Sequence, residues 1–182
     1  MKIIFLLFFF LISLNLFAKT GPVTGLEIPR FVSLKSDDVN LRIGPSTNYP
    51  IIQKYISQNL PIEIIDEFKM WRKTKDNEGT VGWLHKSLIQ GDRFVLTGQN
   101  ENLNVNVYNR PNGKIIGIIK KNNILFLSKC ISSWCKISKD NLTGWLLKKN
   151  IWGVYENEFY KLKFYQPIVD NYWKVLNSKI FN

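Results

Sequence analysis

Residues 39–52 read VNLRIGPSTNYPII, and this segment has the clearest structural pattern in the chain. Its first five residues alternate apolar and polar side chains, which is the period-2 pattern of a strand with one buried face. The run GPSTN at 44–48 then breaks the strand with residues that favour turns. A lone tryptophan at Trp71 and the sequence GTVGWL at 79–84 follow. This order predicts a unit of short β-strands.

A second copy of the pattern follows along the chain. Three matches carry it: VNLRIGP at 39–45 with VNVYNRP at 105–111, WRK at 71–73 with WCK at 134–136, and GWL at 82–84 with GWL at 144–146. The offset shrinks from 66 to 63 to 62 residues, so the second copy has shorter loops and its strands keep their order. Two copies at this spacing predict a pair of small domains rather than a solenoid.

Both copies read as strand-like runs separated by polar turns. The expected strands are 39–43, 51–56, 61–68, 71–75 and 80–84 in the first copy, and 115–119, 124–129, 134–138 and 143–147 after VNV in the second. No helical stripe is long enough to cover a sheet, so five strands in about 60 residues predict a small barrel. The expected fold class is all-β, with two tandem small β-barrels.

The motifs of the first copy resemble a known family. The order V-N-L-R-x-G-P-S-T-x-Y-P-I-I, then a lone Trp, then G-T-x-G-W-L resembles the bacterial SH3-like (SH3b) domain family. The second copy keeps VNV at 105–107 and GWL at 144–146, but has Tyr108 where Arg42 stands and lacks the Gly-Pro-Ser-Thr turn. The resemblance covers residues 28–153. It implies tandem, strongly bent SH3-like barrels that serve exported proteins as binding or targeting modules, often toward cell-wall components or peptides, and it does not by itself imply catalysis.

The N-terminus has the features of an export signal. Residues 1–18 read MKIIFLLFFFLISLNLFA, with a lysine after the first Met, an apolar run and Ala18 at the expected cleavage point. The alternative is an uncleaved membrane anchor, although a spanning helix needs about 20 apolar residues and Ser13 and Asn15 interrupt this run. Cleavage predicts an exported, periplasmic or cell-envelope protein. The expected organisation is a signal peptide at 1–18, barrels at 28–91 and 97–153, and a C-terminal tail at 154–182.

Composition limits the function classes. The chain has 182 residues, a formal net charge of +11, 45% hydrophobic residues, two cysteines and one histidine. This apolar fraction supports a packed core. The scarcity of Cys and His excludes a zinc ribbon, most histidine-based catalysis and a disulfide-dense scaffold, and no cofactor or metal is expected. In an exported setting the positive charge favours peptidoglycan, anionic envelope surfaces or acidic partners over nucleic acid.

The two cysteines are expected to staple a hairpin. Cys130 and Cys135 flank a four-residue loop, so they face each other across two strands, and closing this loop contributes roughly 2 kcal/mol in the chain-entropy model. In the first copy the same positions hold Glu67 and Arg72, an oppositely charged pair. Both copies are therefore predicted to clamp the same hairpin, one covalently and one electrostatically.

The residues give little support for a catalytic function. A cysteine nucleophile needs a histidine base, and His85 aligns with Leu147 of the other copy, which marks it as a structural strand position. The carboxylates that a hydrolase would use lie next to turns of one barrel, and no G-x-S-x-G elbow is present. We therefore expect no catalytic, cofactor-binding or metal-binding residues.

A binding module is the leading hypothesis. The expected ligand-binding residues are aromatic and polar groups around the long turns, namely Arg42, Tyr49, Tyr55 and Trp71. Capping of the barrel is the structural alternative for Tyr49, and Trp71 and Trp134 fit a core position as well as a ligand-facing one. The Gly-Trp pairs are expected to be structural, with the glycines allowing a tight bend and the tryptophans at least half-buried: Gly82, Trp83, Gly144 and Trp145.

The tail supports an alternative function. Residues 166–181, QPIVDNYWKVLNSKIF, have helical spacing of apolar side chains after a proline at the first helical position. Such an amphipathic helix docks on its own barrels, or it binds a membrane surface or a protein partner. The second reading makes the chain an envelope assembly or interaction protein. The sequence does not determine the ligand or the oligomeric state.

Overall fold

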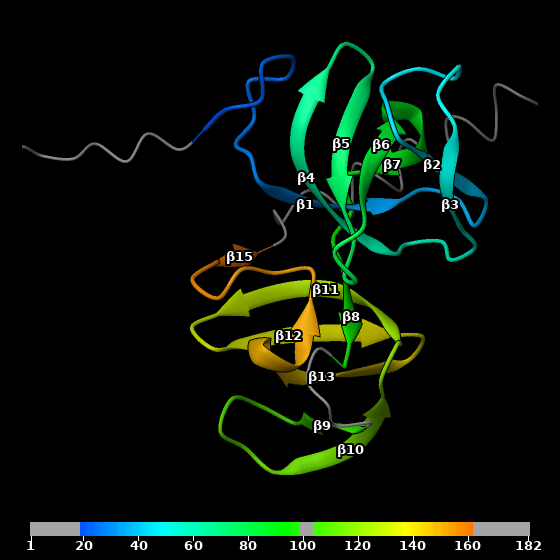
Figure 1. Ribbon diagram of the computed structural model, residues 1–182. Helices are drawn as coiled ribbons and strands as arrows, with labels where there is room; N and C mark the ends of the chain where they lie inside the picture. The colour runs from blue at the N-terminus through cyan, green and yellow to red at the C-terminus, as the bar shows by residue number, and fades with distance from the viewer. Residues whose placement is uncertain (1–18, 99–103, 162–182) are drawn as a thin grey trace, which may run out of the picture.

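The computed structural model describes residues 19–98 and 104–161 of the chain. Within these ranges the secondary structure consists of strands and two short 3₁₀ helices, so the prediction of an all-β fold is confirmed. The strands form two separate sheets, stacked one above the other in Figure 1.

The predicted signal peptide (1–18) and C-terminal helix (166–181) lie outside the described residues. No helix in the described ranges has the length and apolar character needed to span a bilayer.

The first unit is a seven-stranded antiparallel sheet in the order β3-β2-β6-β5-β4-β1-β7. Its strands are β1 (Arg30–Leu34), β2 (Val39–Arg42), β3 (Ile51–Tyr55), β4 (Pro61–Phe68), β5 (Trp71–Lys75), β6 (Val81–His85) and β7 (Ile89–Gln90). The 3₁₀ helix η1 (Lys86–Leu88) connects β6 to β7.

The second unit repeats this topology. Its sheet follows the order β10-β9-β13-β12-β11-β8-β14, and an added strand, β15, pairs with β11. The strands are β8 (Phe94–Thr97), β9 (Asn104–Tyr108), β10 (Ile115–Lys120), β11 (Ile124–Ile131), β12 (Trp134–Lys139), β13 (Leu142–Leu147), β14 (Ile151–Trp152) and β15 (Tyr160–Lys161), with η2 (Lys148–Asn150) before β14. The strand equivalence confirms the internal repeat.

Each sheet is bent but open. The longest strands, β4 and β11, carry register shifts at equivalent points, between Ile64 and Asp66 and between Leu127 and Lys129. An extra residue at such a bulge bends the strand. β4 pairs with β1 before its bulge and with β5 on both sides of it, and β11 pairs with β8 and β12 in the same way. In the described ranges the end strands of each path, β3 with β7 and β10 with β14, do not pair with each other. The expectation of two small barrels is therefore met only in part, because neither sheet closes on itself among the described residues.

Each unit encloses its own hydrophobic core. In the first unit the core centres on Leu34, Leu41 and Ile62, all fully buried. In the second it centres on Leu127 and Leu146 and includes the two cysteines. Side chains alternate across each strand, so every core face leaves an opposite, outer face.

Strand β14 of the second unit and the loop after it pack on the outer face of the first sheet. The ring of Phe31 in β1 meets Trp152 edge-on at 5.1 Å and Tyr155 at 4.7 Å between centroids. The Tyr155 hydroxyl donates to Glu63 Oε1 at 3.0 Å, and Glu63 Oε2 lies 2.6 Å from Lys75 Nζ. These contacts fix the two units against each other.

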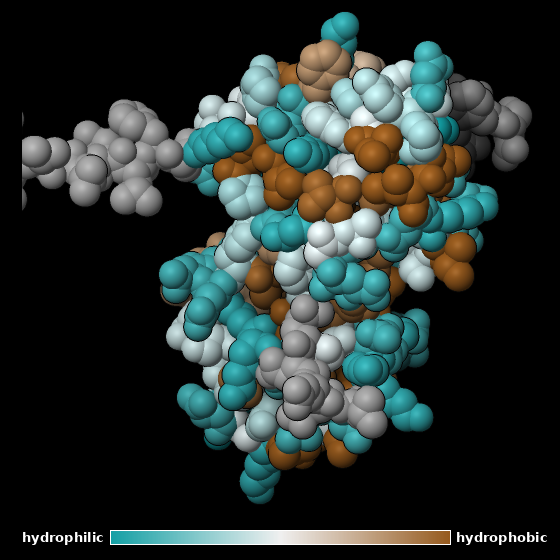
Figure 2. Space-filling view, in the orientation of Figure 1, coloured by the Kyte–Doolittle hydropathy of each residue, from teal (hydrophilic) through white to brown (hydrophobic). Residues whose placement is uncertain are grey.

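The two units differ in the character of their visible surfaces. Above the junction, apolar side chains form a band across the first unit, whereas hydrophilic side chains cover much of the visible face of the second (Figure 2).

Candidate functional site

The strand register gathers polar and aromatic side chains on the outer face of the first sheet. In β5 and β6, Lys73 and Trp83 alternate with buried neighbours and are a direct cross-strand pair. Trp83 is in turn paired with Arg42 of β2. The next row places Trp71 opposite His85. We call these five residues the first outer face.

Tyr49 reaches this face through the turn after β2. Its carbonyl oxygen accepts a hydrogen bond from Arg42 Nη1 at 2.7 Å, and its ring covers Gly44 so closely that a Cβ there would lie 2.6 Å from ring carbons. Tyr49 is nevertheless 46% exposed. The tyrosine thus caps the turn with one side of its ring and leaves the rest accessible.

Trp71 and His85 form the aromatic part of the face. Their ring centroids lie 5.4 Å apart in an edge-on arrangement, and both side chains are half-buried. His85 also caps η1: its Nδ1 lies 2.7 Å from Ser87 Oγ and accepts from the Ser87 backbone N–H at 3.4 Å. The histidine therefore holds local structure, as its alignment with a leucine in the other copy indicates.

Tyr55 is separated from the other predicted ligand-binding residues. It pairs with Val39, whose side chain enters the core, so Tyr55 also points inward and is only 6% exposed. Its hydroxyl donates to Asp76 Oδ2 at 3.0 Å. Burial and the adjacent Asp76 carboxylate raise the pKa of Tyr55 well above its usual range. The second oxygen of Asp76 accepts from the Glu78 and Thr80 backbone, so this pair supports a turn.

The Gly-Trp pairs mark a close approach of two strands. A Cβ on Gly82 would lie 2.6 Å from Leu41 Cγ and 2.8 Å from the Arg42 carbonyl oxygen, and one on Gly144 would overlap Val107 of β9. Both glycines are buried on the core face, where no side chain fits between β2 and β6 or between β9 and β13. Trp83 and Trp145 lie on the outer faces and are half-buried. The glycine requirement is thus one of inter-strand packing.

The equivalent hairpins are clamped in two ways. Cys130 and Cys135 are a direct cross-strand pair joined by a disulfide, which confirms that prediction. Glu67 and Arg72 are the same pair in the first sheet, with Arg72 Nε 3.5 Å from Glu67 Oε1 and both side chains buried. Among the described residues no group of three or more His, Cys, Asp or Glu is arranged to hold a metal ion.

Glu67 binds more than its hairpin partner. Arg30 Nη2 lies 2.6 Å from Oε1, and the Thr24 hydroxyl and the backbone N–H groups of Val23 and Thr24 also donate to the carboxylate. Burial acts to raise the pKa of Glu67, but the hydrogen bonds from Arg30 and Thr24 outweigh it and lower the pKa to about 2. This carboxylate ties the segment before β1 to β4, a role that the sequence pattern did not indicate.

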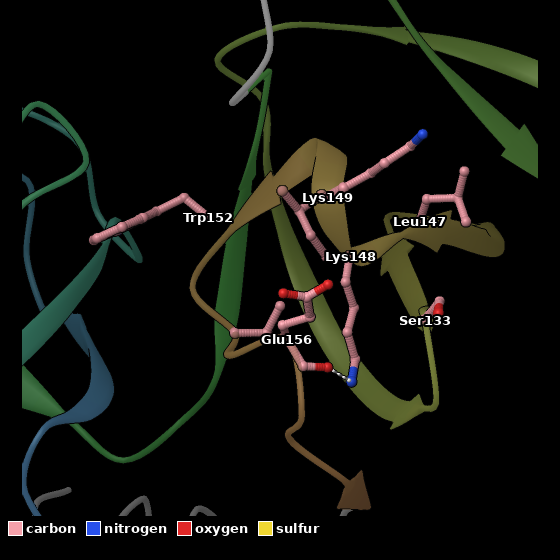
Figure 3. A pocket seen from close by; sticks show the side chains of 8 residues that line it. Ser133, Leu147, Lys148, Lys149, Trp152 and Glu156 are labelled. Carbon is pink, nitrogen blue, oxygen red and sulfur yellow. Dashed lines mark hydrogen bonds between the residues drawn. The ribbon is translucent and has the colours of Figure 1, made fainter.

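Lys148 stabilises the loop that carries the junction. Its ammonium donates to the carbonyl oxygens of Glu156 at 2.8 Å and Glu158 at 2.6 Å, on one side of a cavity of about 370 Å³. Burial lowers the pKa of Lys148, while Glu158 and Glu156 oppose the change. Figure 3 shows Trp152 pointing away from this ammonium, toward the strands of the first unit. The donors of Lys148 are thus used inside the protein.

Arg93 connects the same loop to both units. Its guanidinium forms a two-pronged ion pair with Glu158, at 2.8 and 3.1 Å, and donates to the Gly153 carbonyl at 2.7 Å. It also lies over the rings of Phe31 and Tyr160. The loop, and with it the position of the second unit, is therefore held by partly buried polar contacts that no local sequence pattern reveals.

Comparison with known proteins finds one family in both units. A family model described as bacterial SH3 domain matches residues 35–91 and 101–153, once on each unit. A comparison with curated proteins finds no match. Domains of this family are generally binding modules without catalytic activity, often for the cell wall.

Proposed function

The chain belongs to the bacterial SH3 domain family, and from that premise we propose that it is an exported, non-catalytic module that recognises cell-wall peptidoglycan or peptide ligands. The proposed ligand surface is the first outer face together with Tyr49. Tyr55 is left out of this surface because it points into the core.

The observation that carries the proposal is that the described part of the second unit covers only one row of this sheet face. The junction with the second unit covers the row Phe31–Glu63–Lys75. Arg42 and Trp71 lie in the neighbouring rows. Neither residue takes part in the junction contacts found among the described residues. A fixed and partly aromatic surface therefore remains beside the junction.

The residues on this surface suit a polar polymer or an extended peptide. Half-buried rings such as Trp71 offer a flat apolar side for the face of a sugar or a peptide side chain. Arg42 uses one described hydrogen bond, to the Tyr49 carbonyl, and a guanidinium has five N–H donors. The remaining donors fit the carbonyl and carboxylate oxygens of peptidoglycan stem peptides or of other peptides.

Two features support the proposed exported location. The disulfide between Cys130 and Cys135 persists in an oxidising compartment outside the cytosol. The pattern of residues 1–18 is that of a signal peptide. The alternative, an envelope assembly protein acting through a C-terminal helix, rests on residues 162–182, outside the described residues, and stays a prediction.

Co-sedimentation with purified cell-wall sacculi tests the proposed function. The mature chain should pellet with sacculi, and part of this binding should persist in moderate salt because aromatic stacking is not screened. Trp71→Ala and Arg42→Ala should each weaken pelleting about tenfold or more, whereas Lys35→Ala, which removes a charge from an exposed bend, should not. Arg42→Lys separates the guanidinium geometry from its charge.

Three outcomes would overturn the proposal. Absence of pelleting removes the wall-binding function. If modest salt abolishes pelleting, and Lys35→Ala weakens it as much as the two face variants do, binding depends on net charge alone. Unchanged binding of both face variants moves the site elsewhere. Circular dichroism of each variant verifies that the fold is kept.

A further inference from the structure

A row of three lysines crosses the outer face of the second sheet. Lys129 of β11 is the direct cross-strand partner of Lys136 in β12 and, on its other side, of Lys161 in β15. Directly opposite residues in antiparallel strands point to the same face. With adjacent strands about 4.8 Å apart, the three lysines lie along a line of about 10 Å.

The same row continues into two aromatic side chains. Lys136 pairs with Trp145 in β13, and Trp145 pairs with Tyr108 in β9. Both aromatic residues are half-buried, and the Tyr108 ring is held edge-on against Trp134 at 4.9 Å. Cations and flat rings are thus neighbours on one surface.

The three lysines lie beside one another without a described acidic partner. Among the described residues none of the three forms an ion pair or a side-chain hydrogen bond. Like charges directly opposite each other destabilise a sheet. The first unit avoids this conflict, because Asp66 stands opposite Lys73 where the second unit has Lys129 opposite Lys136.

The charge asymmetry extends over the whole second unit. Residues 104–161 contain ten Lys and Arg against three Asp and Glu, whereas residues 19–98 contain eleven against nine. Glu158, one of the three acids, is used by Arg93 at the junction. The positive excess of the described chain is therefore concentrated on one unit.

We propose that this lysine–aromatic row is a second binding site, which takes an anionic glycan: a polysaccharide whose sugar units carry carboxylate or phosphate groups. The lysines bind the successive anionic groups, and the Trp145 ring stacks on a sugar face. This site goes beyond the proposed function, because it lies on the other unit and does not use the first outer face. Its test needs only the purified chain and defined polymers.

A glycan fits the row better than a lipid surface does. Binding to a bilayer is strengthened by apolar side chains that protrude and insert. Trp145 and Tyr108 are instead half-buried, so each offers only part of its ring to a ligand. A narrow line of charges matches an extended polymer, whose own charges repeat along a line.

Binding of labelled polymers to the full mature chain provides the test. The carboxylate probe is polygalacturonate, the phosphate probe without sugar is polyphosphate, and neutral dextran is the control. A further arm uses vesicles of phosphatidylcholine and phosphatidylglycerol. The triple variant Lys129→Gln/Lys136→Gln/Lys161→Gln should bind polygalacturonate about tenfold or more weakly at low salt, since each lysine near an anionic surface contributes several-fold in affinity.

A matched variant controls for net charge. Lys35→Gln/Lys69→Gln/Lys86→Gln removes the same charge from exposed positions of the first unit, and it should bind polygalacturonate within about twofold of wild type. Trp145→Phe should retain binding, and Trp145→Leu should weaken binding to polygalacturonate but not to polyphosphate. Thermal unfolding of every variant verifies folding.

The outcomes distinguish the possibilities. Equal losses in both triple variants overturn the site in favour of net charge. Tighter binding to anionic vesicles than to polygalacturonate, lost with the row lysines, overturns the glycan in favour of a membrane. If Trp145→Leu binds polygalacturonate as tightly as wild type does, the proposed stacking contact is wrong. Failure of sacculus binding through Arg42 and Trp71 leaves this result unaffected, so the two proposals fail separately.

Discussion

Replacing Glu67 by glutamine should lower the stability of the first unit by about 3 kcal/mol at neutral pH. The Glu67 side chain is fully buried and accepts hydrogen bonds from Arg30, Thr24 and Val23. Its pKa is about 2 in the folded protein against 4.5 ordinarily, and each pKa unit corresponds to about 1.4 kcal/mol, which gives the figure of about 3 kcal/mol. Glutamine keeps the shape but leaves Arg30 and Arg72 without a counter-charge.

The pH dependence of this loss is the sharper measurement. Because the folded-state pKa of Glu67 is lowered, its stabilisation is fully present above about pH 4.5 and is lost as the pH falls toward 2. Urea unfolding of wild type and Glu67→Gln should therefore show a gap of about 3 kcal/mol at pH 7 that narrows toward pH 2. A gap of the same size at both pH values, or none at pH 7, refutes the reasoning. Asp37→Asn, at an exposed position, should change the unfolding free energy by less than about 0.5 kcal/mol.

Three further substitutions test the packing. Replacing Cys130 and Cys135 by serine should lower the free energy of unfolding in urea by about 2 kcal/mol, because the six-residue loop is no longer closed in the unfolded chain. Gly82→Ala should lower it by about 1–3 kcal/mol, since the new Cβ meets the neighbouring strand at 2.6 Å. Tyr155→Phe should cost about 1 kcal/mol, because the hydrogen bond to the Glu63 carboxylate across the junction is lost.

Each of these substitutions has its own control. Reducing agent should bring the wild type to the stability of the serine variant and leave that variant unchanged. Gly91→Ala, where a Cβ meets no heavy atom within 4 Å, should be close to neutral, and a loss equal to that of Gly82→Ala would contradict the packing argument. Tyr160→Phe should also be close to neutral, because no hydrogen bond of that hydroxyl is found among the described residues.

The junction gives the two copies different roles. Phe31, Glu63 and Lys75 of the first sheet are covered by β14 of the second unit and the loop after it. That loop is held in turn by Lys148 and Arg93. These contacts hold the two sheets in a fixed relation to each other.

Local pattern was enough to predict the all-β fold, the two copies and the clamped hairpin. Alternating side chains and turn residues define short strands within a few positions. A disulfide across a tight hairpin joins Cys130 and Cys135, which are five residues apart, so their spacing already constrains the pairing. The charged pair Glu67–Arg72 follows from the same alignment of the copies.

The faces were decided by cross-strand register, which brings together residues distant in sequence. Register turned Tyr55 toward the core and placed Arg42, Trp83 and Lys73 in one row. It likewise aligned Lys161 with Lys129, on a strand that the repeat does not contain. The strands and their order along the chain could thus be predicted from the amino-acid pattern, because they depend on neighbouring residues. The side chains that share a surface could be identified only in the folded sheets, because strand pairing and bulges set the register over tens of residues.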